Sequence, residues 1–149
     1  MITRRDLLVA GVTLVCAFSV MSLAQSAKKP VMHCSVFQWA DLKALPTKSG
    51  ERRGVFDAPT PTLATLECHV TTLNPGAEPH PPHQHADEEM MIIKEGTVAA
   101  YQVDHTNLVT AGGIIFEAAG ELHGLRNAGT NRATYYVIKF VPHDLAAAK

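Results

Sequence analysis

Residues 83–96 read HQHADEEMMIIKEG and combine potential metal ligands with the pattern of a β-strand. Residues two apart in an extended chain point to the same side, so His83 and His85 should aim both imidazoles into one space. After a tight turn at residues 86–87, Glu89 opens a run in which apolar residues alternate on its own side. If that side faces the interior, Glu89 lies at the mouth of a hydrophobic cavity beside the two histidines.

A carboxylate that faces an apolar cavity needs a positively charged partner, and a bound metal cation is an efficient one. Two neutral imidazoles and a carboxylate favour manganese, iron, cobalt, nickel, copper or zinc over calcium or magnesium. The later segment AGGIIFEAAGELHGLRN, residues 111–127, supplies His123 after a turn at Gly120. Strands distant in sequence are often neighbours in a barrel, and we hypothesise that His123 completes the cluster.

Short strand patterns separated by turn residues surround both segments. Strands this short and evenly spaced favour a sandwich or a small barrel over βαβ units. The expected strands are residues 65–73, 83–85, 89–94, 97–103, 113–116, 123–126 and 133–141, followed by a tail, residues 142–149, that contains a brief helix. The length of 149 residues predicts a single domain.

The segment before the strands, residues 25–62, is expected to be an irregular arm. The stretch VFQWADL (residues 36–42) indicates either a short strand or a helical turn. The stretch KALPTKSGERRG (residues 43–54) is typical of a basic, turn-rich loop.

The two ligand-bearing segments resemble the paired motifs of the cupin superfamily, a class of small β-barrels. The first cupin motif is a glycine, five residues, H-x-H, three or four residues, a glutamate, six residues and a glycine. Gly76, His83, His85, Glu89 and Gly96 occupy these places, with six residues rather than five in the first gap. The rest of the motif matches position for position.

The second cupin motif is a glycine, five residues, P-x-G, two residues, a histidine, three residues and an asparagine. Gly112, Gly120, His123 and Asn127 reproduce it, while Ala118 replaces the usual proline. The residue after the first glycine is a second glycine instead of the acidic residue often found there. These departures lie in turns, so they affect the expected loop shape more than the expected ligands.

The resemblance covers residues 63–141 and implies an all-β fold, a single cupin barrel (a double-stranded β-helix or jelly roll) behind an irregular N-terminal arm. It also implies one divalent transition-metal ion per chain (Fe, Mn, Zn, Ni or Cu), with coordination positions open for water or a small-molecule substrate. The implied metal ligands are His83, His85, Glu89 and His123. Small cupins often pair through edge strands and an N-terminal arm, so we expect a homodimer with Phe37 and Trp39 as candidate anchors.

Other polar residues near the motifs receive simpler interpretations. His80 lies between two prolines and is expected to be a solvated loop residue rather than an auxiliary ligand. Asp87 is expected in the turn and Glu88 on the outer side of the strand, and Glu88 becomes the ligand only if the register slips by one residue. The candidates for supporting or proton-transfer roles are Tyr101, Tyr136, His69 and His105.

Alternation with apolar neighbours indicates that Tyr136 and Cys68 point inward, whereas His69 lies on the more polar side of its strand. Cys68 is therefore interpreted as a buried free thiol, in preference to a disulfide with Cys34. His105 is expected in an exposed hairpin turn.

Residues 1–24 have the organisation of an export signal, with Arg4 and Arg5, an apolar stretch, and small residues before Gln25. The stretch TRRDLL resembles a twin-arginine signal, which predicts a periplasmic or secreted protein with no membrane contact after cleavage. A retained membrane anchor is the alternative. The net charge of −1 does not suggest a nucleic-acid partner, and we expect none.

Two functions fit these features. The first is a metal-dependent enzyme, of dioxygenase, isomerase or lyase type, that acts on a small oxygen-bearing organic compound. The second is a non-catalytic periplasmic module that binds or senses a small ligand and keeps a structural metal. The mostly apolar residues at the expected inward positions suit either function, and no general base stands out in the sequence.

Overall fold

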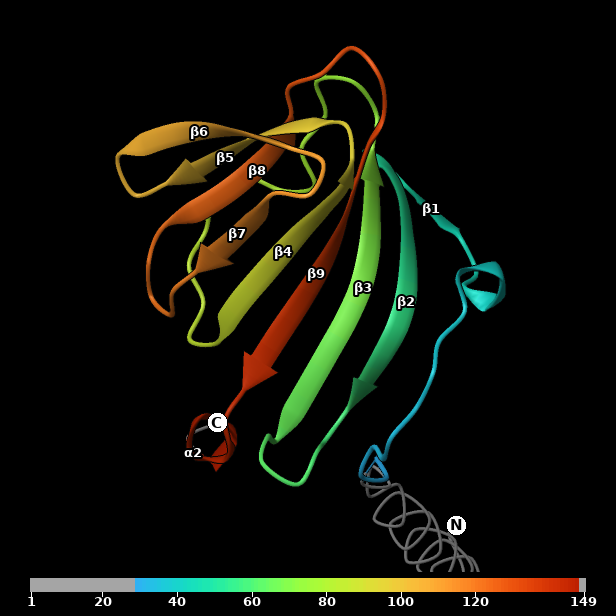
Figure 1. The fold of residues 1–149 in the computed structure, drawn as a ribbon. Helices are drawn as coiled ribbons and strands as arrows, with labels where there is room; N and C mark the ends of the chain where they lie inside the picture. The colour runs from blue at the N-terminus through green and yellow to red at the C-terminus, as the bar shows by residue number, and fades with distance from the viewer. Residues whose placement is uncertain (1–28, 148–149) are drawn as a thin grey trace, which may run out of the picture.

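The computed structural model describes residues 29–147, which form two antiparallel sheets (Figure 1). The larger sheet has the strand order β1-β2-β3-β9-β4-β7, and the smaller sheet has the order β6-β5-β8. The strands are β1 (Leu45–Thr47), β2 (Gly50–Ala58), β3 (Thr65–Leu73), β4 (Glu88–Glu95), β5 (Thr97–Gln102), β6 (His105–Thr110), β7 (Ile114–Glu117), β8 (His123–Asn127) and β9 (Ala133–Val141). The 3-10 helix η1 (Trp39–Asp41) and the helix α2 (His143–Ala147) confirm the predicted helical turn and terminal helix. Within residues 29–147, no helix has the length and apolar character needed to cross a membrane.

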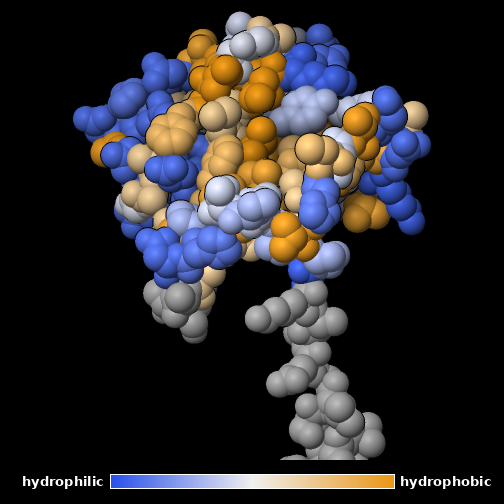
Figure 2. All heavy atoms as spheres, turned by 60° about the horizontal axis from the view of Figure 1, so that its bottom comes forward, coloured by the Kyte–Doolittle hydropathy of each residue, from blue (hydrophilic) through white to orange (hydrophobic). Residues whose placement is uncertain are grey.

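The hydrophobic core lies between the two sheets and takes side chains from both. Its buried members are Leu73, Met91, Ile93, Val98, Ala100, Ile115, Leu125, Ala133, Tyr135 and Val137. Full burial of a Val, Leu, Ile or Met side chain stabilises a fold by about 1.5–3 kcal/mol, so this shared interior holds the sheets together. Viewed from the lower end of Figure 1, apolar residues form a central band flanked by hydrophilic ones (Figure 2). The predicted all-β barrel is confirmed.

Strand β4 turns the predicted side toward the interior. Glu89, Met91 and Ile93 are buried, whereas Glu88 is exposed. Gly96 follows this strand with a φ of 85°, and a Cβ at this position would lie 2.8 Å from the Cα of Ala133. The last glycine of the first motif is therefore required by both the turn and the close packing.

The inward side of β9 is opposite to the predicted one. Tyr135 and Val137 are 2% and 5% exposed and belong to the core, whereas Tyr136 is only partly buried. The prediction for Tyr136 is wrong because both faces of β9 carry apolar residues, so alternation does not identify the inner face. Cys68 is a buried free thiol, as predicted, but it lies on the face of β3 opposite to His69, which lines the interior pocket.

Three segments depart from the expected pattern of strands. Residues 45–58, expected to be irregular, form β1 and β2, and β2 pairs with β3. Residues 105–110, expected to begin with a turn, form the mostly exposed edge strand β6. Residues 83–85, expected to be a strand, make only an isolated bridge at His83. Charged or exposed edge strands lack the alternation that identifies strands in sequence, and the prolines before His83 interrupt a ladder.

Asn127, at the end of β8, joins several loops through its fully buried side chain. Its Nδ2 donates to the carbonyl oxygens of Leu73, Asn74 and Asn131 at 3.2, 3.1 and 2.8 Å. Its Oδ1 accepts a hydrogen bond from the N–H of Gly129 at 2.9 Å. The asparagine of the second motif thus ties the end of β3 and two loops together through backbone groups, which is a structural role.

Replacing Asn127 with alanine should destabilise the fold by about 2–4 kcal/mol, because buried carbonyl oxygens lose their donor. Urea unfolding followed by circular dichroism measures this change. Asn107→Ala, at an exposed position of β6, is the control and should change the stability by less than about 0.5 kcal/mol. Equal unfolding midpoints for Asn127→Ala and the wild type would contradict the role.

Candidate metal centre

Backbone pairing between the two motif segments places their histidines side by side. The N–H of His83 donates to the carbonyl oxygen of His123 at 2.9 Å, and the N–H of His123 donates to the carbonyl oxygen of His83 at 3.0 Å. The N–H of Gly120 donates to the carbonyl oxygen of His85 at 2.8 Å. Gly120 has a φ of 77°, a left-handed conformation that glycine adopts without strain, so it suits the turn before His123.

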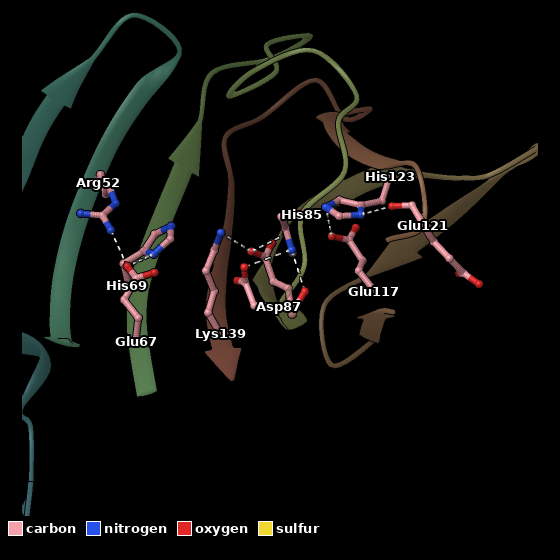
Figure 3. Close-up of polar contacts among 10 residues, drawn as sticks. Arg52, Glu67, His69, His85, Asp87, Glu117, Glu121, His123 and Lys139 are labelled. Atoms are coloured by element: carbon pink, nitrogen blue, oxygen red, sulfur yellow. Dashed lines mark hydrogen bonds and ion pairs between the residues drawn. The ribbon is translucent and has the colours of Figure 1, made fainter. Parts of the chain in front are cut away.

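Hydrogen bonds to backbone carbonyls orient two of the imidazoles (Figure 3). A carbonyl oxygen only accepts, so Nδ1 of His85 donates to the carbonyl of Asp87 at 2.6 Å, and Nδ1 of His123 donates to that of Glu121 at 2.8 Å. In each neutral ring Nε2 is then left unprotonated. One ring nitrogen from each of His83, His85 and His123 lies within 4.8 Å of the others. Metal-binding histidines commonly donate their second nitrogen in this way.

Buried polar atoms without partners indicate that this cluster fits an ion. Apart from Nε of Arg53, such side-chain atoms of the described residues are His83 Nδ1, His85 Nε2, His123 Nε2 and both carboxylate oxygens of Glu117. Each unpartnered buried group costs about 1–3 kcal/mol, and a divalent transition metal accepts imidazole nitrogen and carboxylate oxygen alike. Burial also lowers the pKa of His83 and of His123, which favours the neutral imidazoles that bind metals.

Glu89, the predicted carboxylate ligand, lies beside the cluster and also forms an ion pair with a lysine. Its Oε2 is 3.7 Å from Nε2 of His85 and 3.0 Å from Nζ of Lys139, its neighbour across the β4–β9 ladder. Burial by itself would lower the pKa of Lys139, but the Glu89 carboxylate raises it, so the lysine stays charged. Glu89 therefore has a cationic partner within the protein.

A second carboxyl group, that of Glu117, faces the same cluster from β7 (Figure 3). Glu117 is 2% exposed, lies opposite Glu89 in the β4–β7 pairing, and places its Oε2 3.1 Å from Nε2 of His123. Burial, together with the charge of Glu89, raises the pKa of Glu117 to about 8. The sequence patterns did not single out this residue, because it falls in the gap of the second motif. Glu117 alternates with the apolar Ile115, two residues earlier, and this pattern could have indicated that its side chain points inward.

His83 and His123 of the cluster form part of the wall of a pocket of about 290 Å³. This volume is at the lower end of small-molecule sites, which span about 300–1,000 Å³, so it suits a small compound. Beyond the cluster, its lining includes the apolar residues Met91, Leu125 and Val137 and the polar residues Arg52, His69 and Lys139.

His69 is held in a defined orientation on the pocket wall. Its Nδ1 donates to Oε1 of Glu67 at 2.8 Å, and Nη2 of Arg52 donates to the same oxygen at 2.6 Å. The hydrogen bond from His69 lowers the pKa of Glu67, so this carboxyl stays ionised and fixes the tautomer of the imidazole. A histidine oriented by a carboxylate is a common proton-transfer group. In Figure 3, Lys139 lies between His69 and the clustered histidines.

The remaining candidate residues lie outside the histidine cluster. His80, Glu88 and His105 are exposed, as predicted, although the ring of His80 lies 4.2 Å from that of His83. Tyr101 donates its hydroxyl to a backbone carbonyl of its own hairpin at 2.9 Å, which gives it a structural partner.

Comparison with known protein families assigns the fold. Residues 69–139 match the family model described as the cupin domain. The match and the two antiparallel sheets together give the fold as a cupin barrel. The matched cupin region contains both H-x-H histidines, Glu89 and His123, so the candidate metal centre lies entirely within it. No curated protein matches the chain.

Solved structures with the cupin fold are similar to this chain at low sequence identity. A predicted oxalate decarboxylase from Thermotoga maritima is 15% identical, with a TM-score of 0.61 over 72% of this chain and 99% of that chain. KdgF from Halomonas sp. is 16% identical, with a TM-score of 0.61 over 76% and 99%. The polyketide cyclase RemF from Streptomyces resistomycificus is 23% identical, with a TM-score of 0.59 over 73% and 80%. The TM-scores show a shared fold. At such low sequence identity, a shared fold does not determine which reaction a protein catalyses.

Proposed function

We propose that this chain is an exported, metal-dependent cupin enzyme that acts on a small oxygen-bearing organic compound. The metal is a divalent transition metal held by His83, His85 and His123, with Glu89 as the carboxylate that the motif implies. The reaction is of dioxygenase, isomerase or lyase type. The observation that supports an enzyme is that two of the three converging imidazoles, those of His83 and His123, line one pocket with the oriented His69.

The residues of the pocket suggest how a substrate would be held. A bound transition-metal ion would polarise a substrate oxygen as a Lewis acid. The cationic side chains of Lys139 and Arg52 favour a carboxylate or phenolate group, while the apolar walls favour a hydrocarbon portion. Nε2 of His69 can accept a proton from the substrate and return it, while Glu67 holds the ring.

A non-catalytic binding or sensing module is the alternative function. The apolar residues Met91, Leu125 and Val137 on the pocket wall support it, because they could hold a ligand without reacting with it. The His69–Glu67 pair favours the enzyme, because a wall that only binds a ligand does not need an imidazole fixed in one tautomer by an ionised carboxylate.

Protein purified without an affinity tag should carry about one transition-metal ion per chain, and His123→Ala should lose most of it. Elemental analysis by mass spectrometry measures the content and also identifies the metal. His105→Ala removes an exposed histidine and should retain the wild-type content. Equal metal content in the wild type and His123→Ala would rule out the site.

Replacing His69 with glutamine should reduce turnover by about 10²–10⁴-fold and leave the metal content unchanged, because it removes proton transfer without removing a ligand. Oxygen uptake and product formation on a panel of small organic acids and phenols provide the measurement, with chelated wild type as the blank and His105→Gln as the control. Unreduced turnover in His69→Gln would exclude the proposed role. A ligand that is bound and recovered unchanged would instead support the binding module.

Export and dimer formation complete the proposal. Residues 1–24 lie outside the described residues, and the twin-arginine resemblance predicts that Arg4→Lys with Arg5→Lys keeps the protein in the cytoplasm. Cell fractionation tests this, and unchanged export would exclude the route.

Phe37 and Trp39 are 43% and 40% exposed, which supports a role in pairing two chains, and sedimentation at the mass of one chain would exclude the homodimer.

A further inference from the structure

Both carboxylate oxygens of Glu117 lack a hydrogen-bond partner within the described residues. Its side chain is 2% exposed, and a buried carboxylate without a counter-charge is strongly unfavourable. The neighbouring carboxylate of Glu89 differs, because Nζ of Lys139 lies 3.0 Å away. Two buried carboxyl groups therefore share one nearby lysine, and that lysine makes its ion pair with Glu89. A further cation beside Glu117 would allow both carboxyl groups to be ionised together.

The geometry around Glu117 is that of two ligands on one ion. Its Oε2 is 3.1 Å from Nε2 of His123, yet the two atoms do not have the alignment of a hydrogen bond. Because Nδ1 of His123 donates to a carbonyl, Nε2 of the neutral ring has no hydrogen to donate. Ligands that bind one metal at about 2.0–2.2 Å lie about 2.8–3.1 Å apart at octahedral angles and about 3.3–3.6 Å apart at tetrahedral angles. The two atoms thus approach each other as ligands of a shared cation would.

We propose that Glu117 is itself a ligand of the metal, so that the centre includes His83, His85, His123 and the Glu117 carboxylate. This inference rests on the proposed function, because it requires the metal site. It assigns a carboxylate ligand to β7. Glu117 is one of the five residues after Gly112 whose identity the second motif does not specify. Glu89, which is ion-paired with Lys139, is compared with Glu117 in the same experiment.

Cobalt(II) is the probe, because its visible absorption depends on the number and type of its ligands. Chelator-treated protein is titrated with Co²⁺ in competition with a chromophoric chelator. Glu117→Gln should weaken binding by more than the roughly 10–100-fold that follows loss of an outer-shell partner, and it should change the spectrum. Glu117→Asp keeps the charge but shortens the side chain, so it should also weaken binding and change the spectrum. Glu88→Gln, an exposed position on β4, should match the wild type.

Wild-type affinity and spectrum in both Glu117 variants would overturn the proposal. Weaker binding with an unchanged spectrum would also overturn it, because that result indicates an effect of charge alone. Glu89→Gln should retain tighter Co²⁺ binding than Glu117→Gln, and unaffected binding in Glu117→Gln beside lost binding in Glu89→Gln would assign the carboxylate ligand to Glu89 alone.

Folding and the metal site itself are controlled separately. Chelated Glu117→Gln should unfold at a temperature no lower than the chelated wild type, because the amide has the size of the buried carboxyl group and carries no charge at any pH. If Glu117→Gln does not fold, the charge-conserving Glu117→Asp decides by its affinity and spectrum. A wild type that binds no Co²⁺ would overturn both the proposed function and this inference. A wild type that binds Co²⁺, with Glu117 variants that behave identically, would overturn this inference only.

Discussion

The antiparallel bridge between His83 and His123 is the interaction on which the candidate site depends. Two backbone hydrogen bonds join segments that are forty residues apart, and a third, from Gly120 to His85, fixes the adjoining turn. Because buried backbone groups must be paired, this bridge sets the positions from which the imidazoles project. The side chains then need only local bonds to backbone carbonyls to present their free nitrogens to one another.

Charge pairing organises the pocket wall beyond this bridge. Polar contacts join Glu67 to Arg52 and His69, Glu89 to Lys139, and Glu117 to His123. Each buried acid except Glu117 has a basic partner, which lowers the cost of removing charge from water. Glu117 is buried beside the Glu89 carboxylate without a basic partner of its own among the described residues. Its pKa is therefore raised, and both its oxygens lack a hydrogen bond within residues 29–147.

The cupin fold by itself does not select a reaction for this pocket. The similar structures include a predicted oxalate decarboxylase and a polyketide cyclase, two names that denote different reactions. This chain combines a candidate metal centre with the oriented His69 at a pocket of about 290 Å³. A metal polarises a bound oxygen atom, and a separate histidine avoids the conflict of a ligand that must also transfer protons.

The sequence by itself determined most strands, the inner face of β4 and the three histidines that meet, because side-chain alternation and turn glycines are local properties of the chain. Only the tertiary structure decided that Glu117 and Lys139 face the cluster, that Tyr135 rather than Tyr136 is buried, and that β2 and β6 are strands. These features depend on which strand lies beside which, and in what register. Register is set by packing and by pairing between distant segments, so no window of sequence contains it.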